Sequence, residues 1–320
     1  MKRAIFRFFL IIIAYVLTSA PVNGADAMRN ILVIDNGEAI YDELLDGIRA
    51  EVATRHIDNV NFVNLNELLR QNRSNPTTPC TLLIPVGTKS TKAIIENSIG
   101  APILSVAIPR TNYQTLLKKY RSTKSNQETF TAIFLDQPIS RRVALLHEIL
   151  PNAKRIAVLL GASSINLKDE LEEKLQRYDY SANIDFYTEK RNLVNVLDSL
   201  LEDSDAMLGM ADPTIFNPEN AQNILLTAYR WRVPLIGLSP AYVRAGSLAA
   251  VYTTAPQFAA QAIEAIESEK SCHKITQIQP QHPKYFEVKI NYRVAEAIGL
   301  VIDSQDRLHA KVKQHEVVKK

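Results

Sequence analysis

Apolar runs without polar alternation recur along the chain after residue 28, and each precedes a polar turn and an amphipathic segment. The first run is NILVID at 30–35, and the segment at 39–54 then carries Ile40, Leu44 and Ile48 at helical spacing. An uninterrupted apolar strand is expected where helices cover both faces of a parallel sheet. The pattern therefore predicts an α/β fold with mainly parallel strands.

The strand and helix unit occurs in two successive series, which predict two doubly wound, Rossmann-like lobes. A chain of 320 residues also suits two domains of roughly 100–150 residues each. We expect the chain to cross between the lobes near residues 135, 250 and 280, with 28–135 and about 253–280 in the first lobe and 136–252 and about 281–303 in the second. Two such lobes form a cleft lined by strand ends, and closure about the hinge would trap a ligand.

Two segments depart from the repeating pattern. Residues 109–128 are less regular, and the polar stretch RSTKSNQE at 121–128 is predicted to be a loop. Residues 304–320 are assigned to a charged tail, whose end from 311 onward is expected to fray. Neither segment is assigned a helix.

The first 27 residues resemble a cleavable secretory signal peptide. Lys2, Arg3 and Arg7 precede an unbroken apolar run at 8–17, and the small residues at 25–27 suit a signal peptidase. The apolar run is shorter than the about twenty residues of a membrane-spanning helix, although an uncleaved anchor is the alternative interpretation. We therefore expect an exported protein in the periplasm.

Charge and cysteine content narrow the choice of partners. The net charge is +3, and removal of three basic residues and Asp26 with the signal peptide leaves the protein nearly neutral, so no nucleic-acid partner is expected. Cys80 and Cys272 are the two cysteines. In an oxidising compartment they would be able to pair, and a buried unpaired thiol at Cys80 is the alternative.

The segment at 206–252 carries the clearest candidate binding site. Asp212 follows one predicted strand, and Ser239 follows the next and begins a short helix with Tyr242. Open α/β sheets hold small ligands at the carboxyl ends of neighbouring strands. Asp212 would accept hydrogen bonds from an ammonium or hydroxyl group, although an aspartate before proline also forms turns. Ser239 is an equally good helix cap, and Tyr242 is either an aromatic cleft wall or a packing residue.

The first lobe offers a second group of candidates at the junction of a strand and a helix. Gly87, Thr88 and Ser90 would present amides and hydroxyls at the positive end of a helix dipole, which suits a carboxylate or another small anion. An ordinary helix cap is the alternative interpretation. Less specific candidates, each following the first strand of its lobe, are Asn36, Tyr41 and Ser163.

Catalytic and metal-binding motifs are not evident in the sequence. The chain lacks the Gly-x-Ser-x-Gly, His-Glu-x-x-His and Cys-x-x-Cys patterns, and its six histidines lie singly. A phosphate-binding loop of the Gly-x-x-x-x-Gly-Lys-Ser/Thr type is also missing. We therefore expect no enzymatic activity, no metal and no cofactor.

Five segments together carry a resemblance to a known family. They are GT at 87–88, LPNAKRIAVLL at 150–160, ADPTIFNPEN at 211–220, VPLIGLSPAYVRAGSLAAVY at 233–252 and FEVKINYRVAEAIGL at 286–300. The chain resembles the periplasmic substrate-binding components of ABC transporters, in the branch similar to TrpX-type proteins with the type I binding-protein fold.

The resemblance implies a monomer whose inter-lobe cleft closes on a small polar organic ligand, possibly an amino acid, and then docks to an ABC permease. Carried over by position, Gly87, Thr88 and Ser90 would face the ligand from the first lobe, and Asp212, Ser239 and Tyr242 from the second. A module that presents its lobes to a membrane sensor is the alternative of another class. A two-lobed glycosyltransferase-like enzyme, which would need a nucleotide donor, is the third.

Overall fold

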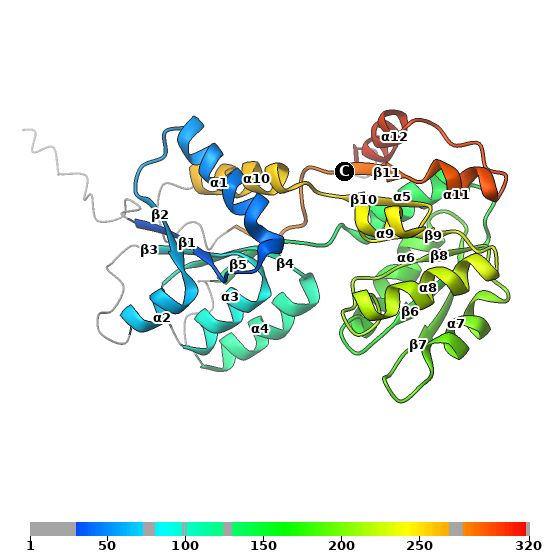
Figure 1. Ribbon diagram of the computed structural model, residues 1–320, viewed down its shortest axis with the longest axis horizontal. Helices are drawn as coiled ribbons and strands as arrows, with labels where there is room; N and C mark the ends of the chain where they lie inside the picture. The colour runs from blue at the N-terminus through cyan, green and yellow to red at the C-terminus, as the bar shows by residue number, and fades with distance from the viewer. Residues whose placement is uncertain are drawn as a thin grey trace, which may run out of the picture.

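The computed structural model describes residues 30–72, 81–97, 99, 101–123, 130–268 and 278–317. Two α/β lobes lie next to each other and are joined by extended segments (Figure 1). The predicted fold class, two doubly wound lobes, is confirmed. The predicted signal peptide and both cysteines lie outside the described residues. In the part of the chain that the structure describes, no helix has the length and apolar character needed to cross a bilayer.

The first lobe is built on a five-stranded parallel sheet with the order β2-β1-β3-β4-β5. This is a common doubly wound order, whose direction reverses between β1 and β3. The strands are β1 (Asn30–Asp35), β2 (Val60–Asn64), β3 (Thr81–Pro85), β4 (Ile103–Ile108) and β5 (Phe130–Phe134). The helices are η2 (Ala39–Tyr41), α1 (Asp42–Thr54), α2 (Leu65–Asn72), α3 (Gly87–Glu96), α4 (Arg110–Thr123) and α10 (Ala255–Ser268).

The second lobe is built on a six-stranded sheet with the order β11-β10-β9-β8-β6-β7. Five strands are parallel and repeat the order of the first lobe, and β11 is added antiparallel to β10. The strands are β6 (Arg155–Leu160), β7 (Ser181–Phe186), β8 (Ala206–Leu208), β9 (Leu235–Ile236), β10 (Ala249–Tyr252) and β11 (Glu287–Ile290). The helices are α5 (Ile139–Ile149), η3 (Ile165–Leu167), α6 (Lys168–Gln176), α7 (Leu193–Leu201), α8 (Pro218–Arg230), α9 (Pro240–Ala245), α11 (Tyr292–Ala297) and α12 (Gln305–Val317).

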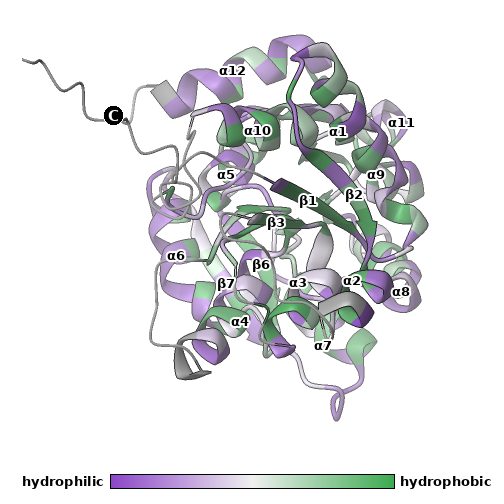
Figure 2. Ribbon diagram, turned by 90° about the vertical axis from the view of Figure 1, so that its left-hand side faces the viewer, coloured by the Kyte–Doolittle hydropathy of each residue, from purple (hydrophilic) through white to green (hydrophobic). Residues whose placement is uncertain are grey.

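Each sheet is buried on both faces, as its apolar strands predict. In β1, Ile31 and Val33 pack towards α1 and α10, whereas Leu32 and Ile34 pack towards the other side of the sheet. Figure 2 shows these apolar strands enclosed by helices whose outer surfaces are largely hydrophilic. Because α10 packs on α1, this late segment belongs to the first lobe (Figure 1). Two chain crossings therefore flank α10.

The lobes are connected by residues 135–138, 253–254 and 278–286, the three segments of the hinge. Gln281 pairs with the edge of β5, so the third segment extends the first sheet before it leaves for β11. The three crossings explain why residues distant in sequence meet between the lobes.

Arg141, in the first turn of α5, holds the hinge segments together. Its Nη1 donates to Gln137 Oε1 at 2.6 Å and to the carbonyl of Pro283 at 2.9 Å. The Gln137 amide in turn donates to Thr253 Oγ1 at 2.6 Å. One buried guanidinium thus contacts the first and third segments directly and the second through Gln137.

The prediction that residues 109–128 lack regular structure is wrong for 110–123, which form α4. The apolar residues that anchor this helix are Tyr113, Leu116 and Tyr120, which are buried at spacings of three and four. Polar residues surround these three apolar residues on every turn and lower the mean hydropathy of the segment. The helical spacing of the apolar residues therefore does not stand out in the sequence. Residues 124–129 lie outside the described residues.

The prediction of a charged, frayed tail is also wrong for residues 305–317, which form α12 against α5 (Figure 1). Leu308 and Val312 are one helical turn apart and fully buried in the core of the second lobe. Two apolar residues do not make an amphipathic pattern in an otherwise polar sequence. The packing of α12 therefore depends on a surface that only the folded lobe provides.

The predicted short helix that begins at Ser239 is confirmed, and α8 begins in the same way. Asn217 and Ser239 accept hydrogen bonds from the amides three residues ahead and begin α8 and α9. Gly246 ends α9 with φ at 130°, a conformation that favours glycine. Side-chain caps of this kind act within one turn of the helix, so the sequence alone determines them.

Candidate functional site

A cavity of about 500 Å³ lies between the two lobes, beside the hinge. This volume suits a small organic molecule. The lining residues from the first lobe and hinge are Ile40, Pro109, Asn112, Leu135, Asp136, Gln137, Thr253 and Phe258. Those from the second lobe are Arg142, Ala211, Asp212, Pro213, Phe216, Leu238, Ser239, Pro240, Tyr242, Val251 and Tyr252.

The walls of the cavity are mostly apolar and aromatic. Phe216 and Tyr242 meet edge to face with ring centroids 6.0 Å apart, and Tyr252 and Phe258 add two further rings. Ile40 is 82% exposed beside this opening. Apolar walls with a few polar groups are typical of pockets that bind organic ligands.

Arg142, in the first turn of α5, is the most unusual group in the cavity. Its Nη2 donates to the carbonyl of Gly209, and its Nη1 lies 3.7 Å from the sulfur of Met210. Its buried Nε has no hydrogen-bond partner among the described residues, and no carboxylate there forms an ion pair with it. Burial lowers the pKa of Arg142 to about 10, so the group remains a cation at neutral pH. A buried cation of this kind favours an anionic ligand.

Asp136, in the first hinge segment, supplies a carboxylate to the same cavity. Its Oδ1 accepts a hydrogen bond from the amide of Arg110 at 2.6 Å, and His282 Nδ1 lies 3.9 Å from its Oδ2. Burial raises the pKa of Asp136 above the usual value for an aspartate. A cationic group of a ligand would compensate for that burial and favour the charged carboxylate. Cationic and anionic groups thus line one cavity.

Of the residues predicted to bind ligand, the structure brings three to the cavity, all from the second lobe: Asp212, Ser239 and Tyr242. The Tyr242 hydroxyl is buried without a hydrogen-bond partner among the described residues. Ser239 also caps α9, accepting from the amide of Tyr242 at 3.4 Å. One residue therefore serves as a cap and lines the cavity.

Asp212 lines the cavity, but its carboxylate is already occupied. Oδ2 accepts from the amide and the hydroxyl of Ser164 at 3.0 and 2.8 Å, and Oδ1 accepts from the amide and hydroxyl of Thr214 at 3.0 and 2.7 Å. The residue is 1% exposed. The two bonds from Ser164 join the loop after β6 to the loop after β8, and the two from Thr214 lie within the loop after β8. These contacts fix the cavity wall, and the expectation that Asp212 receives a ligand ammonium group stays a prediction.

The predicted site at the start of α3 does not line the cavity. Gly87 adopts φ of 78°, and the ring of Tyr41 lies so close that a Cβ at Gly87 would be 2.4 Å from its Cζ. Ser90 is fully buried and donates its hydroxyl to the carbonyl of Val86. Thr88 does not line the cavity but contacts a residue that does. Its Oγ1 accepts a hydrogen bond from Nδ2 of Asn112 at 3.1 Å, and Asn112 lines the cavity.

The two remaining candidates also lie away from the cavity lining. Asn36 closes a local turn, accepting from the amide of Glu38 at 2.8 Å and donating to its carboxylate. Ser163 is half-buried in the turn after β6, where its neighbour Ser164 makes the contact with Asp212. The serine that contacts Asp212 is thus the residue next to Ser163.

The sequence did not point to Arg142 or Asp136 as residues of the cavity, although the position of Arg142 is unusual for an arginine. In α5, Arg142 lies three residues after Ile139 and four before Leu146, both buried. An arginine on the apolar stripe of a helix must be paired or face a cavity. Asp136 follows a strand in the hinge and has no comparable local pattern.

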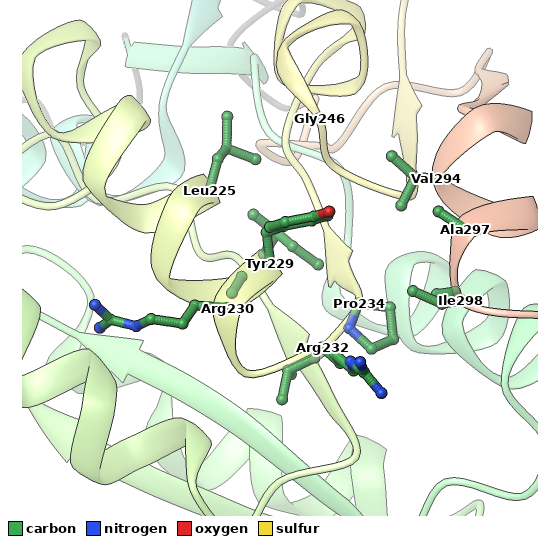
Figure 3. A pocket seen from close by; sticks show the side chains of 12 residues that line it. Leu225, Tyr229, Arg230, Arg232, Pro234, Gly246, Val294, Ala297 and Ile298 are labelled. Carbon is green, nitrogen blue, oxygen red and sulfur yellow. The ribbon is translucent and has the colours of Figure 1, made fainter.

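A second cavity, of about 530 Å³, lies at the far end of the second lobe (Figure 3). It is bounded by α8, the start of β9 and α11, with Leu225, Tyr229 and Ile298 among its lining residues. It contains no residue of the first lobe, and Arg230 beside it already pairs with Asp198. Lobe closure does not act on this cavity, so the inter-lobe cavity is the better candidate site. Within the described ranges, no three histidine, cysteine or acidic side chains gather to hold a metal ion.

A family model described as "ABC transporter substrate binding protein" matches residues 30–316, almost the whole described chain. The chain belongs to this family. Members are solute-binding proteins that take a small molecule and work with an ABC permease, and the predicted family is thereby confirmed. No match was found among curated protein sequences.

Solved structures share the fold of this substrate-binding protein. An ABC domain from Streptococcus pneumonia in complex with L-Trp has a TM-score of 0.59 and 16% identity, covering 86% of this chain and 95% of that one. A conserved domain protein from Vibrio cholerae has a TM-score of 0.60 and 19% identity, covering 89% and 98%. A ligand-free, open substrate-binding protein with adhesive properties from Clostridium difficile has a TM-score of 0.64 and 15% identity, covering 87% and 97%.

Proposed function

We propose that this substrate-binding protein works as a periplasmic monomer that captures an amino acid in the inter-lobe cavity and delivers it to an ABC permease. The observation that carries the proposal is Arg142, a buried cation with an unpartnered Nε on the wall of that cavity. A ligand carboxylate would pair with the guanidinium by charge-assisted hydrogen bonds, in addition to the longer-range attraction of Asp136.

The other groups of the cavity favour an amino acid over a simple organic acid. Asp136 offers a carboxylate for the ligand ammonium group, and the Tyr242 hydroxyl offers a further hydrogen bond. Phe216, Tyr252 and Phe258 form aromatic walls suited to a large apolar side chain. The structural relative from Streptococcus pneumonia, which is described in complex with L-Trp, supports the same class of ligand.

A thermal-shift screen of residues 28–320 against the amino acids tests this function. We expect an aromatic amino acid at a hundred times its dissociation constant to stabilise the protein by about 2.7 kcal/mol. Tryptamine, which lacks the carboxylate, should bind far more weakly than L-Trp. Arg142→Gln should abolish the shift and Tyr242→Phe should reduce it, whereas Tyr229→Phe on the exposed surface of α8 serves as the control. A shift of unchanged size in Arg142→Gln would remove the basis of the proposal.

An ion pair between the lobes should favour the closed, ligand-bound state. Arg110 of α4 and Glu170 of α6 are joined at 2.7 Å, with side chains 25% and 30% exposed. Because such a half-exposed pair contributes up to about 1 kcal/mol, we expect Glu170→Gln to weaken ligand affinity by up to about fivefold at low salt. The difference should shrink at high salt, measured by calorimetric titration. Glu172→Gln, which alters a pair within α6, is the control and should leave the affinity unchanged.

A further inference from the structure

A small cavity with basic walls lies behind the hinge, on the second lobe. It has a volume of about 260 Å³ and is lined by Ser140, Arg141 and Ala144 of α5, by Lys174 and Arg177 at the end of α6, and by His315 and Glu316 of α12. None of these residues lines the inter-lobe cavity. Since a water occupies about 30 Å³, the cavity has room for a small ion and several waters.

The cations that line this basic cavity outnumber the carboxylates that pair with them directly. Arg141, Lys174 and Arg177 are cations, and the carboxylates that pair with them are Glu316 and Glu173. Glu173 is shared by Lys174 and Arg177. Three permanent cations of the cavity wall therefore share two carboxylates, whereas Glu148 pairs with His315 and with Lys311.

The cations that line the cavity come from two helices, α5 and the end of α6, and therefore surround it from more than one side. Arg141 is 5% exposed at its side chain and fixed by Gln137 and Pro283, so its guanidinium is held in place before any ion arrives. Ser140 lies in the first turn of α5, where the helix dipole adds positive potential. Lys174 and Arg177 are 20% and 43% exposed and both pair with Glu173, so an ion would compete with that carboxylate for them.

We propose that this basic cavity binds a small multivalent oxyanion of the inorganic phosphate class. Phosphate has several acceptor oxygens and matches the planar donor fork of arginine. The ion would compete with Glu316 for Arg141, since both are anions directed at the same guanidinium. The proposal does not depend on which ligand occupies the inter-lobe cavity.

Calorimetric titration of residues 28–320 with sodium phosphate, at constant ionic strength set with sodium chloride, tests the site. We expect saturable binding at one site per chain. Lys174→Gln combined with Arg177→Gln should weaken it by about tenfold or more, because each removes a charge-assisted bond. Lys190→Gln, an exposed lysine on the loop before α7, is the matched control. Glu316→Gln should tighten binding, an effect that a purely structural role of this glutamate would not produce.

Three results would overturn the proposal. They are the lack of saturable phosphate binding in the folded protein, unchanged binding in the Lys174 and Arg177 double variant, and loss of binding in Arg142→Gln with retention in that double variant. The last result would place the ion in the inter-lobe cavity. Circular dichroism of each variant confirms that the chain is folded, so a loss of binding is attributable to the removed charge.

Discussion

Replacing Asp212 with alanine is expected to lower the free energy of unfolding by about 3–5 kcal/mol. The carboxylate accepts four hydrogen bonds, two from Ser164 and two from Thr214, in a site that is 1% exposed. Each buried donor left without an acceptor costs about 1–3 kcal/mol, and relaxation of the two loops recovers part of the total. Urea unfolding followed by circular dichroism measures the change.

Two comparisons make this result specific to the carboxylate. Asp212→Asn keeps one oxygen acceptor and should lose less stability than Asp212→Ala. Asp169→Ala, an exposed aspartate on α6, should change the free energy of unfolding by less than about 0.5 kcal/mol. If Asp212→Ala were as stable as the parent protein and lost only ligand binding, Asp212 would be a ligand contact after all.

Replacing Leu308 with alanine is expected to lower the free energy of unfolding by about 2–5 kcal/mol. Leu308 is 1% exposed on α12 and packs into the core of the second lobe with Phe286 and Val312. Removing its side chain leaves a cavity between α12 and the lobe. A lower urea midpoint with an unchanged slope would show that the loss is one of stability.

The control for α12 is Lys313→Ala, an exposed residue five positions after Leu308. It keeps the helical propensity of the segment and should leave the urea midpoint within experimental scatter. Equal stability of Leu308→Ala and Lys313→Ala would mean that α12 does not pack on the lobe in solution, as the expectation of a frayed tail implies.

Helices α4 and α12 show where the hydrophobic pattern of a sequence fails to predict a helix. In α4 the pattern was present, because Tyr113, Leu116 and Tyr120 follow helical spacing, but polar neighbours hid it. In α12 the hydrophobic pattern was too weak to detect, because only Leu308 and Val312 are buried apolar side chains among its residues 305–316. A helix that depends on tertiary contacts for its stability leaves little trace in its own sequence.

In the candidate site, too, the sequence indicated some of the residues and only the tertiary structure indicated the others. Ser239 and Tyr242 were identified because strand ends of a parallel sheet meet at one edge. The pairing of Asp212 with Ser164, 48 residues apart, required the packing of two loops. The sequence predicted that the start of α3 is accessible to a ligand. Only the tertiary structure places the ring of Tyr41 against Gly87.

The sequence by itself determined the α/β class, the two lobes and the start of the short helix at Ser239, because strand burial and helix capping act over a few residues. The tertiary structure decided which polar groups face the inter-lobe cavity. Arg142 and Asp136 come from α5 and the hinge, and the walls that enclose them come from both lobes. Their surroundings depend on three chain crossings and on the distance between two separately folded lobes, which no local pattern encodes.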